Sequence, residues 1–513
     1  MTDRKFLIDT NIFIGLEDQK EVPLELAEMA NLCSQNHVRL FVHEDAIKDI
    51  NRDKDAIRRK ISLSKLSKFE RLKGIPLPPE SELEERFGKI SKVNDKVDVA
   101  LLHALDIGAI DFVVTQDQGI HSRARRFVPY LGERVFFIAD AFSWLRTTFE
   151  STKVQLPFIK EMPAHAVSLK DEIFDSLREG YPGFDDWWRN KCVNEHRPCW
   201  IATINNELAA IVVRKEEKAA EATTKYSGTK ILKICTFKVK PKYRGQKLGE
   251  QLLKQILWFS QKNAFDLVYL TTFPNQTSLI SVLEYFGFEC TKNIAAGEQV
   301  FEKKLSTEKL TVTPGDDLFY LARTHYPRFV CVPPAEAFCV PIQSNFHNAL
   351  FPELANQFQE DLFGASSYGP LAAIPGNTIR KVYLCRAQIN KLNPGSVIVF
   401  YRSQSPGYIA SQSVTSVGVV EAVTSATSLE ELIRLTAKRS VYSQEQLAKF
   451  EASEVKPVKV IDFLLIGHFD PPLALSDLKK SGVFNGSPPQ SICKLSADRF
   501  EPLRQKMKFG FQV

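Results

Sequence analysis

The 513-residue sequence has no long apolar run, no cysteine pair of the C-x-x-C type, no internal repeat and no low-complexity tract. Without an apolar run of about 18 residues, we expect no membrane-spanning helix. The first residues carry charges and lead directly into a short apolar segment, which is unlike a secretory signal peptide. The nine cysteines are widely spaced. This spacing argues against a structural zinc site and predicts reduced thiols in a cytoplasmic protein.

A strong excess of one charge is also missing. The formal net charge of +6 permits a polyanionic partner without requiring one. A hydrophobic content of 44% beside 25% charged residues is ordinary for globular proteins. A chain of this length is too long for a single core, so we expect about three or four domains. The patterns below divide it into an N-terminal module (1–150), a middle module (160–310) and a C-terminal module (315–513).

The N-terminal module alternates short apolar segments with helix-like ones. The stretches "KFLIDTNIFI", "RLFVHEDAI", "DFVVTQD" and "RVFFIAD" predict four strands, and segments such as "VDVALLHALDIG" predict helices between them. Short apolar strands that alternate with helices favour an α/β fold, in which a parallel sheet lies between two helical layers.

Four aspartates follow these strands or lie on the adjoining helices: Asp9, Asp49, Asp98 and Asp117. The carboxyl ends of parallel strands meet at one edge of a sheet, so distant positions become neighbours there. Crowded carboxylates repel one another and favour a hard cation such as Mg²⁺ or Mn²⁺, which can activate water for phosphodiester cleavage. The alternative is structural, because an aspartate after a strand is also a common helix cap.

The contexts "LIDTNIFI", "LFVHEDAIKDI", "DVALLHAL" and "DFVVTQDQGI" resemble those of the PIN-domain ribonucleases. The resemblance covers about the first 145 residues and implies a metal-dependent endoribonuclease. It implies four metal ligands, supported by Asn11 and Thr115; the ligands are Asp9, Asp49, Asp98 and Asp117. The second acid of the family is usually glutamate, which makes Glu44 a rival of Asp49 and leaves Asp95 as a fifth candidate.

Two basic segments accompany these acids. Residues 51–74 contain nine Lys and Arg against three Asp and Glu, and "HSRARR" follows Asp117. Basic surface beside an acidic site suits a polyphosphate substrate, whereas the alternative is a solvated helix face. The candidate RNA contacts in this module are Arg58, Arg59, Lys60, Arg123, Arg125 and Arg126.

The middle module is predicted to have an α+β fold, with a hairpin in "PCWIATINNELAAIVVRKE". The segment "KILKICTFKVKP" predicts a strand that enters "KYRGQKLG" and then an amphipathic helix. Backbone N–H groups at such a helix start, with Gly245 and Gly249 allowing close approach, suit a pyrophosphate.

The pattern V-x-P-x-x-R-G-x-x-x-G, followed by a strand and "NQTSLISVLEYFGF", resembles the GNAT acetyltransferases over roughly 165–305. The resemblance implies an acetyl-CoA site formed by Val239, Arg244, Gly245, Gln246, Lys247, Leu248, Gly249 and Asn275. Lys247 replaces a usual glycine of this family. Leu283 stands where a tyrosine often protonates the departing thiolate, and Tyr285 comes two residues later. Cofactor binding is therefore expected, and acetyl transfer stays open.

The C-terminal module contains many short apolar segments, which predict a compact β-barrel-like fold. "PGNTIRKVYLCRAQINKLNPGSVIVFYRS", "VTSVGVVEAV", "AKRSVYS" and "PPQSICKLS" resemble the PUA-like domains of the ASCH and EVE kind, which implies RNA binding. The alternative is that the aromatic residues belong to the core. The candidate contacts are Tyr401, Arg402, Lys438 and Arg439, with Ser403, Tyr442, Gln490 and Ser491 beside them.

Three hypotheses follow. The first is a metal-dependent endoribonuclease that cleaves structured RNA, with tRNA suspected, and binds acetyl-CoA. An enzyme with this architecture could serve as a toxin or defence effector, with an inhibitory protein as its partner. The second is an N-acetyltransferase acting on RNA or protein, whose outer modules target the substrate. The third is a non-enzymatic RNA-binding scaffold.

Overall fold

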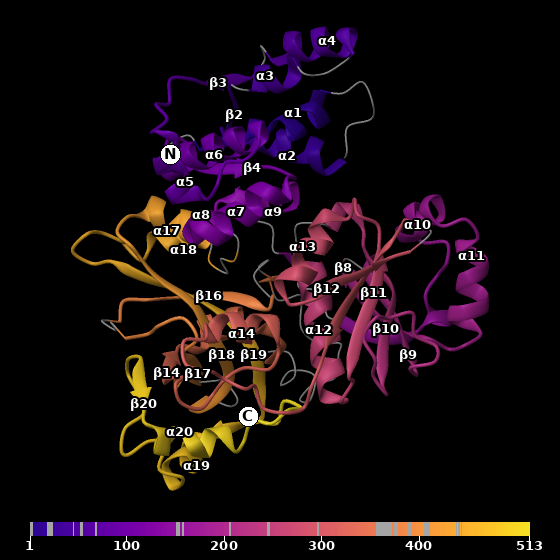
Figure 1. Cartoon of the computed structure of the whole chain (residues 1–513). Coiled ribbons are helices and arrows are strands. Elements are labelled where there is room, and N and C mark those ends of the chain that lie inside the picture. The colour runs from indigo at the N-terminus through magenta and orange to yellow at the C-terminus, as the bar shows by residue number, and fades with distance from the viewer. Residues whose placement is uncertain are drawn as a thin grey trace.

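The computed structural model describes residues 4–17, 24–44, 46–51, 55–66, 69–149, 154–155, 159–204, 207–243, 247–294, 297–354, 372–373, 378–387, 391–404, 411–437, 439, 442 and 444–513. Three large sheets organise these residues, one in each of the predicted modules, and a two-stranded sheet is formed by more distant segments. Figure 1 shows the N-terminal module at the top, the middle module on the right and the C-terminal module at the lower left. Within the described residues no helix is long and apolar enough to cross a membrane.

The N-terminal sheet has five strands in the order β3-β2-β1-β4-β5, all of them parallel. Alternate residues of the central strand β1 face opposite ways: Phe6 and Ile8 enter one core and Leu7 enters another. Helices cover both faces, so the parallel α/β prediction is confirmed. The strands are β1 (Lys5–Ile8), β2 (Arg39–His43), β3 (Glu70–Leu72), β4 (Phe112–Val114) and β5 (Val135–Phe136). The helices are α1 (Thr10–Glu17), α2 (Leu24–Gln35), α3 (Ala46–Asn51), α4 (Ala56–Leu66), α5 (Glu80–Phe87), α6 (Val93–Asp106), α7 (Gln118–Phe127), α8 (Pro129–Gly132) and α9 (Ile138–Phe149).

The middle sheet has seven strands in the order β12-β13-β11-β10-β9-β8-β7. One face packs against α12 (Leu248–Lys262) and α13 (Thr277–Tyr285), and the other against α10 (Asp175–Gly180), α11 (Phe184–Trp187) and a π-helical turn (Trp188–Val193). The predicted hairpin is present as β8 and β9, with its turn at 205–206 outside the described residues. The strands are β7 (Ile159–Pro163), β8 (Pro198–Ile204), β9 (Glu207–Glu217), β10 (Ile231–Val239), β11 (Leu267–Thr272), β12 (Glu289–Asn293) and β13 (Gln299–Lys304).

The C-terminal sheet has six strands in the order β16-β19-β18-β17-β14-β20, with only β14 and β17 parallel. Among the described pairings β16 and β20 are edge strands, so a closed barrel stays a prediction. The strands are β14 (Ala337–Ile342), β16 (Arg380–Cys385), β17 (Val397–Arg402), β18 (Ser413–Ala426), β19 (Val458–Ala474) and β20 (Cys493–Leu495). The helices are α14 (Leu318–Thr324), α15 (Ser344–Leu350), α17 (Leu429–Thr436), α18 (Gln444–Ala448), α19 (Leu475–Lys480) and α20 (Ala497–Arg504).

The three modules share their cores. One buried cluster joins α12 and the middle sheet to the C-terminal sheet, and another joins the N-terminal sheet to the C-terminal module. Polar contacts follow the same boundaries. The indole N–H of Trp258 donates to the Tyr326 hydroxyl at 2.7 Å, and that hydroxyl donates to the Leu465 carbonyl at 2.7 Å. The short strand β6 (Val154–Gln155), between the N-terminal and middle modules, pairs with β15 (Ala372–Ala373) of the C-terminal module.

A buried ion network also crosses the boundary between the N-terminal and C-terminal modules. The Arg439 guanidinium reaches Glu133 at 2.7 Å, Glu421 at 3.1 Å and Asp462 at 3.1 Å. Arg380 reaches Glu133 at 3.2 Å and also pairs with Glu421. Because unpaired buried charges are costly, this network fixes the two modules in one arrangement.

Candidate functional site

The candidate site begins where β10 and β11 separate. The two strands pair in parallel only from Ile231 and Leu267 to Ile234 and Leu270. The register of β10 against β9 then shifts at Cys235, which is the sign of a β-bulge. The remaining part of β10 is paired with β9 but with no residue of β11, so the sheet opens along this edge.

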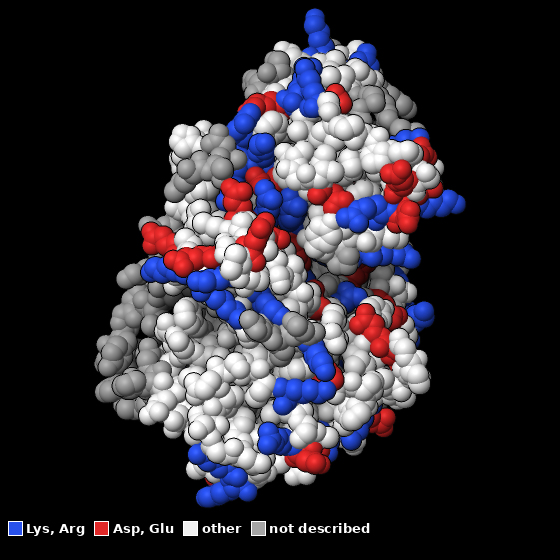
Figure 2. All heavy atoms as spheres, turned by 90° about the vertical axis from the view of Figure 1, so that its left-hand side faces the viewer, with Lys and Arg blue, Asp and Glu red and all other residues white. Residues whose placement is uncertain are grey.

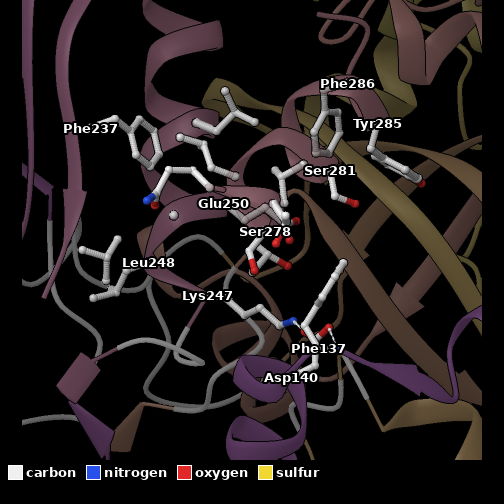
Figure 3. A pocket seen from close by; sticks show the side chains of 18 of the residues that line it. Phe137, Asp140, Phe237, Lys247, Leu248, Glu250, Ser278, Ser281, Tyr285 and Phe286 are labelled. Carbon is white, nitrogen blue, oxygen red and sulfur yellow. Dashed lines mark hydrogen bonds and ion pairs between the residues drawn. The ribbon is translucent and has the colours of Figure 1, made fainter. Parts of the chain in front are cut away.

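A cavity of about 440 Å³ lies at this opening. Its volume is within the range of small-molecule sites. Five of the predicted cofactor residues line it, namely Val239, Lys247, Leu248, Gly249 and Asn275. The other three, Arg244, Gly245 and Gln246, lie outside the described residues. In Figure 3 Phe237 and Leu248 lie on the left of the cavity and Ser281 and Tyr285 on the right, with Glu250 and Ser278 between them.

The start of α12 forms one end of this cavity. Lys247 adopts a left-handed conformation with φ of 58°, and the 15-residue helix α12 follows it directly. A Cβ added to Gly249 would meet only the Phe237 ring, at 3.8 Å, which is an ordinary contact. The described residues therefore leave open space beside Gly249 in the first turn of α12. Free N–H groups and the helix dipole make such a turn suitable for phosphate, and the residues fit the pyrophosphate of acetyl-CoA.

The other two modules complete the wall. The N-terminal module contributes Gln116, Arg125, Phe137 and Asp140, and the C-terminal module contributes Thr378, Arg380 and Arg439. The Lys247 ammonium pairs with the Asp140 carboxylate, as the dashed line in Figure 3 shows. Burial alone would lower the pKa of Lys247, but Asp140 outweighs burial and the pKa is raised. No local sequence signal identifies Phe137 or Asp140, because only the packing of the modules brings them here.

The position of the usual tyrosine of GNAT enzymes holds no proton donor, because Leu283 is an apolar residue and is fully buried. Tyr285 lines the cavity instead, and its hydroxyl donates to Glu421 at 3.1 Å. The guanidinium groups of Arg323 and Arg380 each lie 4.5 Å from its ring centre. Burial raises the pKa of Tyr285 well above its usual value. These contacts hold the tyrosine between modules.

The N-terminal acids form a second group of interest. Asp9 Oδ2 accepts hydrogen bonds from the Thr115 hydroxyl at 2.7 Å and from the Asn11 amide at 2.8 Å. Asp117 caps α7 by accepting from the Gly119 N–H at 2.6 Å. Burial, with Asp117 and Asp9 nearby, raises the pKa of Asp98 to about 7. The sheet therefore brings Asp9, Asp98 and Asp117 together.

The other candidate acids, Asp49, Glu44 and Asp95, do not complete a metal site with these three aspartates in the described structure. The side chain of Asp49, on α3, lies outside the described part of the structure, and Glu44 is exposed. Asp95 accepts from the backbone N–H groups of Ser91 and Lys92 and so has a capping role. Among the described residues no group of three or more His, Cys, Asp or Glu side chains is arranged to hold a metal ion. The predicted Mg²⁺ or Mn²⁺ site is thus not shown.

The basic residues of the N-terminal module divide into several environments. Arg123 Nη1 donates to the carbonyls of Phe87, Gly88 and Lys89, which makes it a structural residue. Arg125 faces the cavity, whereas Arg126 is exposed. Arg59 and Lys60 lie on α4, and the side chain of Arg58 lies outside the described residues. On the face in Figure 2, Lys and Arg are intermingled with Asp and Glu and form no continuous basic surface.

The C-terminal candidates are mostly buried. Tyr401 packs in the core against Phe484, which is the alternative that the sequence left open. The buried Arg402 donates from Nε to the Ser344 hydroxyl at 3.0 Å, and Arg439 belongs to the buried ion network. Lys438 lies outside the described residues. None of these three described side chains is on open surface.

Comparison with known proteins assigns the middle module. Residues 164–288 match the model of the acetyltransferase (GNAT) family. Among solved structures, ASCH from Zymomonas mobilis shares 19% identity over 33% of this chain and 94% of its own, with a TM-score of 0.23. PaiA N-acetyltransferase from Thermoplasma acidophilum in complex with coenzyme A shares 15% over 29% and 98%, with a TM-score of 0.23. A GNAT family acetyltransferase from Elizabethkingia anophelis with acetyl-CoA bound shares 17% over 29% and 98%, with a TM-score of 0.21.

No curated protein matches the chain. The family match does not extend to the N-terminal module, so a PIN domain is not shown. The match does span the bulge of β10, the start of α12 and the residues of α13 that enclose the cavity. The chain is a multidomain protein that carries a GNAT acetyltransferase domain over residues 164–288.

Proposed function

We propose that the chain is an acetyl-CoA-dependent N-acetyltransferase whose acceptor is an amine on RNA or protein. The observation that carries this proposal is the cavity at the open edge between β10 and β11, next to the start of α12. The unpaired edge of β10 offers backbone groups to the amides of pantetheine. The first turn of α12 offers N–H groups to the pyrophosphate.

Acetyl-CoA supplies the acetyl group as a thioester. In the transfer the acceptor nitrogen forms a bond to the acetyl carbon and loses a proton to solvent, the carbon–sulfur bond breaks, and the sulfur takes up a proton. With Leu283 apolar and Tyr285 bound to Glu421, the described lining of the cavity offers no free tyrosine to protonate the sulfur, so we assign this proton to solvent. The contribution of the protein is then to hold amine and thioester together, which by itself accounts for a large part of such rate enhancements.

The test is transfer of labelled acetyl from acetyl-CoA to total RNA and to cellular protein, with Gly249→Leu as the matched inactive variant. A Cβ at this position makes only an ordinary contact, so the variant is expected to fold while its longer side chain fills the cavity. Gly180→Leu is the control, since a Cβ there has no atom within 4 Å. Loss of transfer and of acetyl-CoA binding only in Gly249→Leu supports the proposal. Absence of both in the wild-type protein refutes it.

A second candidate function is endoribonuclease activity of the N-terminal module. It is favoured by the proximity of Asp9, Asp98 and Asp117 and by the elevated pKa of Asp98. Since the described residues do not form a metal site, we derive no step through Mg²⁺ or Mn²⁺. The test incubates wild type and Asp98→Asn with total RNA in Mn²⁺, Mg²⁺ or EDTA. Discrete fragments that require metal and Asp98 support the nuclease, name its RNA and justify a search for an inhibitory partner. Intact RNA in every condition removes this candidate.

A non-enzymatic RNA-binding scaffold is the remaining alternative. It predicts RNA binding that EDTA does not change, without transfer of acetyl or cleavage of RNA. The two incubations above separate it from both enzymes.

A further inference from the structure

The cofactor cavity is lined by Arg125, a cation from outside the acetyltransferase domain that has no ion-pair partner among the described residues. Five cations line the cavity against two carboxylates; the cations are Arg125, Lys238, Lys247, Arg380 and Arg439, and the carboxylates are Asp140 and Glu250. An excess of positive charge in a partly enclosed cavity favours an anionic ligand.

Most of these cations are already paired. Lys247 is bound to Asp140, Arg380 to Glu133 and Glu421, and Arg439 to the same two glutamates and to Asp462. These groups hold the modules together and are not available for a ligand without breaking that contact.

Arg125 differs from them. Among the described residues no carboxylate lies within ion-pair distance of its guanidinium, and Nη1 donates to the Ser281 hydroxyl at 3.3 Å. Burial, together with the nearby Arg380, lowers the pKa of Arg125 from its usual range. A largely enclosed guanidinium beside a second one is costly, and an anion in the cavity would relieve that cost.

Gln116 provides an independent observation on the same wall. Its side-chain oxygen is buried and has no hydrogen-bond partner among the described residues, although Gln116 lines the cavity. Buried polar atoms are almost always hydrogen-bonded, so this acceptor is suited to an N–H group of a ligand. Gln116 and Arg125 thus both have unused hydrogen-bonding or charged groups at the cavity. They lie in one stretch of the N-terminal module, Gln116 just before α7 and Arg125 within it.

We propose that Arg125 binds a phosphate group of the cofactor, so that the N-terminal module supplies part of the acetyl-CoA site. The proposal rests on the proposed function, because it assumes that acetyl-CoA occupies the cavity. Coenzyme A carries phosphate both in its pyrophosphate and on its ribose, and the same guanidinium chemistry suits either.

The experiment measures dissociation constants by calorimetry on the full chain for coenzyme A, 3′-dephospho-coenzyme A and S-acetylpantetheine, which has neither phosphate. Arg125→Ala is compared with Arg126→Ala, which removes the same charge from the next, exposed position of α7. Loss of one charge-assisted hydrogen-bonding group is expected to weaken coenzyme A binding about tenfold to a hundredfold. S-acetylpantetheine binding should be unchanged in both variants.

Coenzyme A and 3′-dephospho-coenzyme A together show which phosphate Arg125 binds. If Arg125→Ala weakens both equally, the guanidinium binds the pyrophosphate. If it weakens only coenzyme A, the guanidinium binds the ribose phosphate. Equal affinities for Arg125→Ala and wild type with every ligand overturn the inference while leaving the proposed function intact. Absence of coenzyme A binding by the wild type overturns both. If Arg125→Ala is unfolded, Arg125→Gln, which keeps a donor for Ser281, carries the same comparison.

Discussion

Asp140 competes with the phosphates of acetyl-CoA, and its removal should tighten cofactor binding. The carboxylate pairs with Lys247 at the start of α12, where the proposed pyrophosphate site lies. The side chains are only 15% and 20% exposed, so solvent screens this pair less than a surface pair. Asp140→Asn keeps the shape of the side chain, removes its negative charge and leaves Lys247 free for the ligand.

The magnitude follows from Coulomb's law. Two unit charges about 5 Å apart at an effective dielectric constant of about 20 repel each other by roughly 3 kcal/mol. Salt and displacement of the carboxylate reduce this to an expected gain of about 1–2 kcal/mol, which is roughly tenfold in the dissociation constant. The unliganded variant should be less stable than the wild type by a similar amount, because Lys247 loses its buried partner.

Calorimetry with acetyl-CoA measures the first effect, and urea denaturation of the unliganded protein measures the second. Tighter binding together with lower stability is the expected pair of results. An unchanged or weaker affinity would refute the reasoning, since it would mean that the carboxylate holds Lys247 in position for the ligand rather than competing with it.

Three further substitutions test other parts of the structure. Arg439→Ala removes the cation that pairs with Asp462 and leaves Glu133 with Arg380 alone, so it should lower the free energy of unfolding by about 3–5 kcal/mol in urea; a loss below about 1 kcal/mol would contradict a stabilising role of this ion network. Tyr285→Phe should keep the acetyl-transfer rate within about twofold and cost about 1 kcal/mol of stability, whereas a drop of about a hundredfold or more would identify Tyr285 as the proton donor. Asp98 has a folded-state pKa of about 7, above its unfolded value, so its ionisation destabilises the protein increasingly from about pH 4 to pH 7 and fully above that. Asp98→Asn should therefore match the wild type near pH 4 and exceed it by about 2–4 kcal/mol at pH 8 in EDTA, and a constant difference across pH would contradict the shift.

The sequence was sufficient for those features that depend on local pattern. The parallel N-terminal sheet follows from apolar strands that alternate with helices, and the residues of β1 alternate between two cores as a strand buried on both faces must. The acetyltransferase domain was predictable because Val239, Leu248 and Gly249 lie in a motif whose spacing reflects phosphate binding at a helix start.

The sequence was insufficient wherever the meaning of a residue depends on which module packs against it. Arg125 and Arg126 are adjacent in one basic run, yet one faces the cofactor cavity and the other is exposed. Tyr401 and Arg439 are of residue types that are typical of RNA-binding surfaces. Yet Tyr401 lies in the core, and Arg439 lies in a buried ion network. Contacts between distant segments carry no local periodicity, so no spacing rule could have separated these cases.

The two candidate activities are physically connected through α7. Asp117 caps the start of this ten-residue helix, and the adjacent Gln118 donates from its side chain to the Thr277 carbonyl at the start of α13, at 3.0 Å. Arg125, near the other end of α7, reaches Ser281 on the same helix α13. A helix of ten residues is about 15 Å long, and α7 contacts α13 near both of its ends, so the cap at Asp117 and the cavity wall on α13 are directly connected.

Such a connection must act in both directions. If acetyl-CoA changes the affinity of the acidic group for its ligand, that ligand changes the affinity for acetyl-CoA by the same factor. A titration of acetyl-CoA with and without RNA therefore detects the coupling without knowledge of which reaction is catalysed. Equal dissociation constants in the two titrations would show that α7 is only a spacer between independent sites. Unequal constants would show that binding of RNA and binding of acetyl-CoA are coupled in this chain.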